Sequence, residues 1–187
     1  MTKKHDAVKK WNRWKQFIED EKKESIKTTQ KTWRDNFVEK QAVKAFYANL
    51  NESRMKKLWK EESIGNITKV ITLLEKRLAT FLVQINFVKT PFEANQWITH
   101  KHVKVNNIIV KQPNFLLSAG DTITFDEYVT KNESILKNKP WLEATSVKQN
   151  NNWVFDPQTK AVVFLGVGGQ SPFETSTWER TKSFYKA

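Results

Sequence analysis

The chain has 187 residues, of which 39% are hydrophobic and 28% charged, so it has room for one domain of ordinary size with extensions and a modest core. Its formal net charge of +12 indicates a polyanionic partner, either nucleic acid or an anionic membrane face. The absence of cysteine excludes disulfides, iron–sulfur clusters and zinc sites built on thiolates.

The N-terminal third is the most basic part of the chain and is predicted to be helical. Residues 1–62 contain no glycine or proline, and they hold 17 basic residues against 10 acidic ones. Their apolar residues recur at irregular helical spacing. They include Trp11, Trp14, Phe17, Ile18, Trp33, Phe37 and Val38. We therefore expect a basic helical region over residues 1–75, and the acidic residues near its start argue against a transit peptide.

A further helix is predicted after Asn51, which is placed to cap it. Met55, Leu58 and Trp59 fall on one face of this helix and are expected to be buried. Basic residues surround the rest of its surface. They are Arg54, Lys56, Lys57 and Lys60. For one helix taken alone, such charges are explained by contact with water, without any partner.

Residues 70–88 are the longest apolar-rich stretch, and they are predicted to form one amphipathic helix that ends near Asn86. The apolar residues of its buried face recur at helical spacing. They are Val70, Leu74, Leu78, Phe81 and Ile85. Glu75, Lys76 and Arg77 lie at the centre of the stretch, and three charges there argue against a membrane span.

A short capped helix is predicted to follow. Thr90 is a suitable N-cap, Pro91 suits the first helical position, and Glu93 is placed to complete a capping box. The buried stripe of this helix is expected to consist of Ala94, Trp97 and Ile98.

The next segment is predicted to be a hairpin followed by a strand. Residues 102–110 alternate apolar and polar side chains around Asn106 and Asn107. Because asparagine tolerates positive φ, this pair predicts a two-residue turn. Residues 120–125 predict a further strand, entered through a glycine turn. The buried side chains of the hairpin are expected to be Val103, Val105 and Ile109.

The predicted fold class is α+β. A helical region over residues 1–75 precedes a helix-turn-helix with a small antiparallel β-sheet over residues 76–137. Residues 138–187 are predicted to form a largely irregular C-terminal extension, with a strand or two and a final short helix.

No catalytic residue, metal site or cofactor is predicted. The histidines are His5, His100 and His102, and neither a cysteine nor a convincing carboxylate accompanies them as a metal ligand. The glycine-rich residues 166–169 lack the lysine of a phosphate-binding loop and are predicted to form a turn. No serine or histidine lies in a recognisable nucleophile motif.

The order of elements over residues 77–125 resembles the RNA-binding domain of small-subunit ribosomal protein four, the S-four domain. The resemblance begins with the pair Arg77–Leu78 and continues through the second helix, the hairpin and the closing strand. The further matching residues are Thr90, Glu93, Ala94, Gln96, His100, Val103, Val105, Asn106, Val110, Gly120, Asp121 and Ile123. Departures are Ala79 in place of a frequent acidic residue, Pro91 and Asn95 in place of arginines, and Asn107 in place of the turn glycine.

Two flanking stretches are similar to the same ribosomal protein. KQAVKAFYANLNESRMKKLWKEE, residues 40–62, is similar to the helical stretch that precedes the domain in that protein. KPWLE, residues 139–143, resembles a short element that follows it. The likeness therefore covers residues 40–143.

The resemblance implies a structural constituent of the small ribosomal subunit that binds small-subunit rRNA, helps its assembly and catalyses no reaction. The implied partners are this rRNA, neighbouring small-subunit ribosomal proteins, and mRNA where it enters the subunit, with no membrane and no cofactor. The divergent sequence, rich in lysine and asparagine, fits an organellar ribosome, and we expect a mitochondrion in preference to a plastid. Two alternatives share the domain: a ribosome-associated rescue factor, and an RNA-modifying enzyme that uses it as an accessory.

The junction between the second helix and the hairpin is the predicted RNA-binding face. Lysines bind phosphates as mobile charges, and the amides at the start of the second helix are expected to add partial positive charge. Asparagine and glutamine side chains suit 2′-hydroxyls or base edges, and the histidines fit either contact with RNA or ordinary surface placement. The predicted RNA-binding residues are Lys40, Lys44, Arg54, Lys56, Lys57, Arg77, Lys89, Thr90, Asn95, Gln96, His100, Lys101, His102, Lys104, Asn106 and Lys111.

Overall fold

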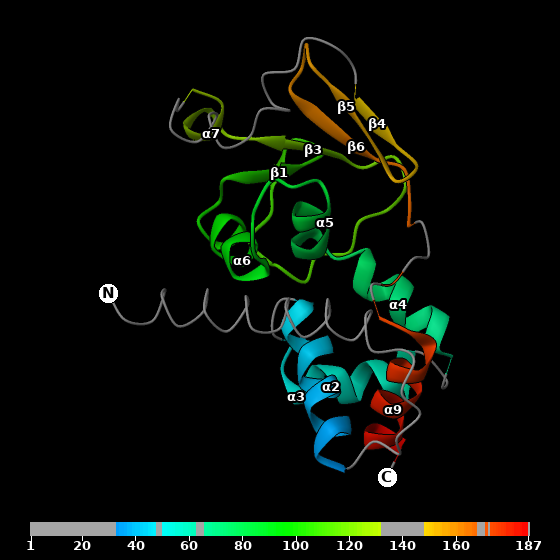
Figure 1. The fold of residues 1–187 in the computed structure, drawn as a ribbon. Coiled ribbons are helices and arrows are strands. Elements are labelled where there is room, and N and C mark those ends of the chain that lie inside the picture. Colours follow the sequence, from blue (N-terminus) through cyan, green and yellow to red (C-terminus); the bar gives the residue numbers. More distant parts are fainter. Residues whose placement is uncertain are drawn as a thin grey trace. The chain divides into compact units, whose positions relative to one another are not determined.

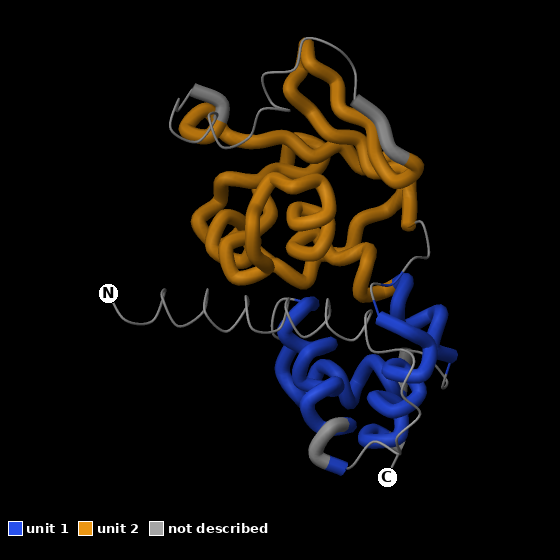
Figure 2. Tube along the Cα trace, in the orientation of Figure 1, with its two compact units in different colours: residues 1–72, 169–187 blue, residues 73–168 orange. Residues whose placement is uncertain are grey.

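The computed structural model describes residues 33–47, 50–62, 66–131, 148–167, 171 and 173–186. It confirms the predicted α+β class, and the chain separates into two compact units (Figure 2). The helical unit comprises residues 1–72 and 169–187, and the sheet unit comprises residues 73–168.

The helical unit combines helices that are far apart in the sequence (Figure 1). They are α2 (Trp33–Phe46), α3 (Glu52–Lys57), the short π-helical turn η1 (Leu58–Glu62) and α9 (Thr175–Lys186). Asn51 caps α3 as predicted, because its Oδ1 accepts a hydrogen bond from the Arg54 N–H at 2.8 Å. α4 (Ile67–Glu75) begins in this unit and ends in the sheet unit.

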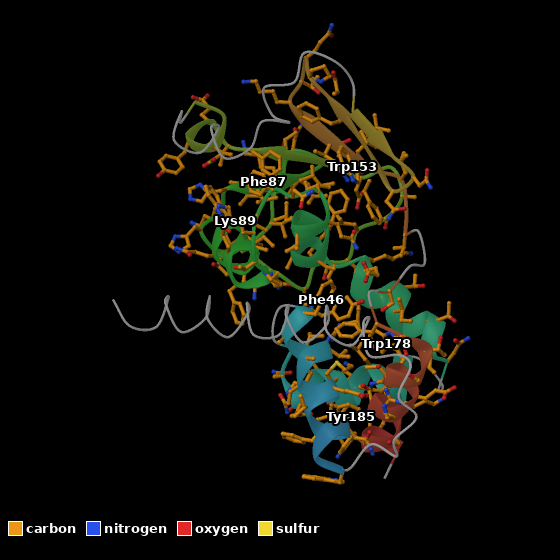
Figure 3. The ribbon with its side chains drawn as sticks, viewed as in Figure 1. Phe46, Phe87, Lys89, Trp153, Trp178 and Tyr185 are labelled. Carbon is orange, nitrogen blue, oxygen red and sulfur yellow. The ribbon has the colours of Figure 1, made fainter. Side chains whose placement is uncertain are left out.

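Aromatic side chains form the centre of the helical unit. The ring of Trp178 on α9, labelled in Figure 3, is the centre of this group. Its centroid lies 5.9 Å from that of the Tyr47 ring and 6.4 Å from that of the Trp59 ring. All three residues are buried. Met55 and Leu58 are buried as well, which confirms the predicted inner face of the helix after Asn51.

Glu52 is the centre of a polar cluster that joins α2, α3 and α9. Its carboxylate accepts hydrogen bonds from Lys44 Nζ at 2.7 Å and from the Tyr185 hydroxyl at 2.6 Å, and Lys40 Nζ lies 3.3 Å away. Burial alone would raise the pKa of Glu52, but these hydrogen bonds and the Lys44 charge outweigh it and lower the pKa to about 2. Burial and the hydrogen bond to Glu52 raise the pKa of Tyr185.

Replacing Glu52 by glutamine should destabilise the protein at neutral pH and have little effect in acid. Because folding holds the Glu52 pKa below its ordinary value of 4.5, the ionised carboxylate stabilises the fold above that value, and this contribution is lost as the pH falls towards 2. The side chain is 51% exposed, so solvent screening limits the effect to about 1 kcal/mol. Urea unfolding of both proteins at a series of pH values measures the difference.

The exposed carboxylate Glu179 on α9 offers a matched control for this experiment. Glu179→Gln removes the same charge from the same unit and should leave the free energy of unfolding nearly unchanged at every pH. A Glu52→Gln difference that stays constant between neutral pH and about pH 3 would contradict a stabilising role for the ionised carboxylate.

The sheet unit contains a six-stranded antiparallel sheet in the order β2-β1-β3-β6-β5-β4. The strands are β1 (Val103–Val105), β2 (Ile108–Ile109), β3 (Thr122–Phe125), β4 (Lys148–Asn150), β5 (Trp153–Asp156) and β6 (Ala161–Phe164). α5 (Leu78–Gln84) and α6 (Pro91–Thr99) lie on one side of this sheet, and α7 (Glu127–Lys131) follows β3 (Figure 1). The core of the unit includes Leu78, Phe81, Ile98, Ile123 and Phe164.

The predicted hairpin and glycine turn are confirmed. Asn106 and Asn107 have φ values of 50° and 65°, as a tight turn between β1 and β2 requires. Gly120 has a φ of 94°, and β3 begins two residues later. The expected burial of Ile109 was wrong: its side chain is 47% exposed, because β2 is a short strand at the edge of the sheet.

The single long helix predicted for the apolar-rich stretch was also wrong. The chain forms α4 and α5 instead, and between them Arg77 adopts an extended backbone with a ψ of 134°. Arg77 forms an antiparallel bridge with Leu116, and the Leu78 N–H donates to the Phe115 carbonyl at 2.8 Å. Pairing with this later segment interrupts the helix at a point where the helical spacing of the apolar residues continues.

The C-terminal part of the chain is more regular than we predicted. β5 and β6 form a hairpin, and β6 pairs with β3 through Ile123 and Val162, so residues 148–167 extend the sheet. α9 belongs to the helical unit instead. The foreseen strands and final helix are present among the described residues of the extension, and these residues belong to two different units. The domain boundaries at residues 75 and 137 stay a prediction, and the compact units group the chain differently.

Three predicted features lie wholly or partly outside the residues that the structure describes. They are the N-terminal segment with Trp11, Trp14, Phe17 and Ile18, the KPWLE element at residues 139–143, and the glycine-rich turn at residues 166–169. Among the helices that are described, none has the length and apolar character needed to cross a membrane.

Candidate nucleic-acid interface

α6 begins with the cap that the sequence predicts. Thr90 Oγ1 accepts a hydrogen bond from the Glu93 N–H at 3.2 Å, and Pro91 occupies the first helical turn. The Glu93 carboxylate accepts from the Lys89 N–H at 3.0 Å instead of closing a capping box on Thr90. The cap engages one amide of this first turn, and the partial positive charge expected at the helix start stays a prediction.

The other end of α6 turns the chain sharply into β1. His100 ends the helix, and Lys101 has a left-handed backbone with a φ of 69°. The next residue, His102, donates its backbone N–H to the Trp97 carbonyl at 3.1 Å. His100 and Lys101 are exposed, as is Lys89 before the first turn of α6. Figure 3 labels Lys89. Exposed cationic side chains thus flank α6 at both ends.

A series of aromatic rings continues from the end of α6 onto α7. The His102 ring lies 6.3 Å from the His100 ring and 5.3 Å from the Tyr128 ring, and its plane is inclined to them by 7° and 26°. Trp97 meets His102 edge-on at 5.0 Å, and Trp97 is only partly buried, although we predicted it in the core. His102 Nδ1 donates to Asp126 Oδ2 at 2.7 Å, since a carboxylate only accepts.

The hairpin supplies fewer free groups than predicted. Asn106 is exposed, but its Oδ1 accepts from the Thr122 N–H and its Nδ2 donates to Asp121 Oδ1, both at 2.9 Å. These bonds fasten the hairpin turn to the start of β3, so Asn106 acts in the fold. Lys104 is partly buried on β1, and Lys111, beyond β2, is exposed.

Three cationic residues predicted to contact RNA lie inside the protein. Lys40 and Lys44 are each 8% exposed and pair with Glu52. Arg77 is 5% exposed, and its Nη2 donates to Asn114 Oδ1. Their charges are engaged within the fold, and their contact with RNA stays a prediction. Thr90 is buried as well and is engaged as the cap of α6, so its contact with RNA also stays a prediction.

The remaining predicted residues are divided between the two units. On α3 of the helical unit, Lys56 and Lys57 are exposed and Arg54 is partly buried. In the sheet unit the exposed candidates are Lys89, Gln96, His100, Lys101, Asn106 and Lys111. The partly buried candidates there are Asn95, His102 and Lys104.

Sequence reasoning missed Asp126 and Tyr128. Asp126 Oδ1 accepts a hydrogen bond from the Val129 N–H at 3.2 Å and caps α7. Aspartate is a preferred helix cap, so its position after a predicted strand was the local signal that could have identified it. No local signal places Tyr128 against His102, because their contact depends on the pairing of β1 with β3.

The arrangement supports binding through charge, hydrogen bonds and ring stacking. Within the part of the chain that the structure describes, no group of three or more histidine and acidic side chains is placed to hold a metal ion. The exposed groups are lysines, amides and stacked rings, which suit a polyanion that also carries flat aromatic bases.

Comparison with known proteins agrees with this geometry. A model of the S4 domain matches residues 76–123. The small ribosomal subunit protein uS4m of Dictyostelium discoideum is 33% identical over 132 residues, which is 71% of this chain and 43% of that protein. The small ribosomal subunit protein uS4 of Methylobacterium nodulans is 38% identical over 94 residues, 47% of this chain and 44% of that protein. The chain thus spans less than half the length of these relatives.

Proposed function

We propose that this chain, which belongs to the uS4 family of small ribosomal subunit proteins and contains an S4 domain, is a structural constituent of a small ribosomal subunit. It would bind small-subunit rRNA and help the subunit to assemble, without catalysing a reaction. The match to the Dictyostelium discoideum protein extends well beyond residues 76–123. This length favours uS4 over a rescue factor or an RNA-modifying enzyme that shares only the domain.

The exposed lysines that flank α6 are the observation that carries the proposal. Lys89 and Lys101 are exposed at its two ends, in a chain with a net charge of +12. Lysine side chains attract phosphates as mobile charges, and Gln96 and His100 add groups that suit 2′-hydroxyls and bases. Basic residues on α3 provide a second cationic surface, in the helical unit.

The proposed partners are small-subunit rRNA, neighbouring small-subunit ribosomal proteins, and mRNA where it enters the subunit. The proposed compartment is the mitochondrion. Relatives named uS4m in two Dictyostelium species support it, as does the lysine- and asparagine-rich sequence. A plastid ribosome is the alternative compartment.

Sedimentation of a native mitochondrial extract in magnesium tests this function. The full chain, carrying an epitope tag, should migrate with the small subunit at every stage of translation. Ribonuclease treatment should move it to the top of the gradient, which shows that RNA holds it there. Occupancy restricted to split large subunits would favour the rescue factor instead. Migration with neither subunit would contradict a ribosomal role.

A further inference from the structure

Three rings on the surface of the sheet unit lie in series with nearly parallel planes. His100, His102 and Tyr128 come from the end of α6, the start of β1 and α7. Their planes are close to parallel, with inclinations of 7° and 26° between successive rings. The two outer rings reach solvent, since His100 is exposed and Tyr128 is 58% exposed. A large aromatic side chain this exposed has most of a ring available to a partner.

The central ring of this series is held in place from two sides. His102 Nδ1 is fixed by Asp126 Oδ2 at 2.7 Å, and Trp97 meets the ring edge-on at 5.0 Å. The Asp126 N–H also donates to the His102 carbonyl at 3.1 Å, and Asp126 Oδ1 caps α7 through Val129. One aspartate therefore fixes both the imidazole and the helix that carries Tyr128. A prearranged surface loses less conformational entropy when a ligand binds.

We propose that His100, His102 and Tyr128 form a stacking platform that takes an unpaired base of RNA. This inference rests on the proposed rRNA-binding function and adds the kind of nucleotide that this part of the surface recognises. Stacking on aromatic side chains is a general way of holding unstacked RNA bases, because every base presents a π-face.

An exposed lysine lies between the two histidines of the platform in the sequence. This residue, Lys101, suits the phosphate of the same or a neighbouring nucleotide. The exposed lysine and the exposed Tyr128 ring therefore suit the two parts of a nucleotide, its phosphate and its base.

Substitutions of Tyr128 separate stacking from simple surface contact. Tyr128→Phe keeps the aromatic face. Tyr128→Leu keeps the apolar bulk of the side chain but removes the aromatic face. With the full chain and a fluorescently labelled transcript of small-subunit rRNA as the probe, Tyr128→Phe should bind like the parent. Tyr128→Leu should bind about tenfold more weakly, a typical loss for one stacked base. Thermal melts should coincide for all three proteins, because the side chain is largely exposed.

The dependence of affinity on salt concentration is a second measurement, and it changes only when a charged contact with RNA is lost. Loss of a stacking contact removes no phosphate neutralisation, so Tyr128→Leu should weaken binding equally at every salt concentration. Lys89→Glu with Lys101→Glu should reduce the salt slope instead. Together, these two patterns show that the platform and the lysines contribute through different interactions.

Three other outcomes would overturn the platform, and the last of them would also overturn the proposed function. Parent-like binding by Tyr128→Leu would overturn the platform, and the proposed function would stand if the lysine variant is still weakened. Equal losses for Tyr128→Phe and Tyr128→Leu would also overturn it, because the hydroxyl would then be the contact. If the parent protein itself shows no salt-dependent binding to the transcript, both the rRNA-binding function and the platform fail.

Discussion

Replacing Leu78 by aspartate should leave the sheet unit unable to fold. Leu78 begins α5, is completely buried, and donates its backbone N–H to the Phe115 carbonyl. A carboxylate at this position would be moved from water into an apolar core with no cationic partner supplied by the substitution. We expect a loss of more than about 4 kcal/mol, comparable with the whole stability of an ordinary domain.

Circular dichroism and thermal melting measure this effect directly. The variant should lose the cooperative transition of the sheet unit, or express only as insoluble protein. Ile108→Asp is the matched control, because it makes the same kind of change on β2 at a side chain that is 71% exposed. The control should melt close to the parent. A cooperative melt of Leu78→Asp at the parent temperature would contradict the assigned core.

Features that depend on neighbouring residues were predictable from the sequence. Thr90 caps α6 because a threonine before Pro91 can accept from the N–H three residues later. Asn106 and Asn107 form the hairpin turn because asparagine tolerates positive φ. Each signal lies within four residues of the structure it specifies, so the chain itself contains the information locally.

Features that depend on distant partners were not predictable. The helical periodicity around Arg77 is intact, yet the helix breaks because Leu116 pairs with that residue from much later in the chain. No local signal shows that Lys40 and Lys44 pair with Glu52, or that Tyr185 donates a hydrogen bond to the same carboxylate. Helical spacing identifies which residues share a face, but it does not show whether that face meets water or another helix.

The candidate site also combines features set by neighbouring residues with features set by distant ones. The exposed residues at the end of α6 were predictable because a capped helix of fixed length places His100 and Lys101 at its C-terminal end. The role of Tyr128 was not, since β1, β3 and α7 must assemble before its ring meets His102. The prediction therefore named the exposed lysine and the two histidines near the end of α6, but it missed Tyr128, whose contact with His102 depends on tertiary structure.

Reversing the charges of Lys89 and Lys101 should weaken RNA binding without unfolding the protein. If the parent contacts about 6 to 10 phosphates, its affinity should fall by about 10³- to 10⁵-fold between 50 and 200 mM salt. Lys89→Glu with Lys101→Glu should lower affinity at least about tenfold at moderate salt and reduce the slope of log affinity against log salt by about 2. Both side chains are exposed, so the melting temperature should be nearly unchanged.

A charge-matched variant shows whether RNA binding depends on the positions of Lys89 and Lys101 or only on the total charge of the chain. Lys160→Glu with Lys182→Glu changes the net charge by the same amount, at the turn between β5 and β6 and on α9. If binding depends on the ends of α6, this control should retain most of the parent's affinity and salt slope. Equal losses in the two double variants would mean that the chain attracts RNA only through its overall charge, and the assignment of Lys89 and Lys101 to the interface would then be wrong.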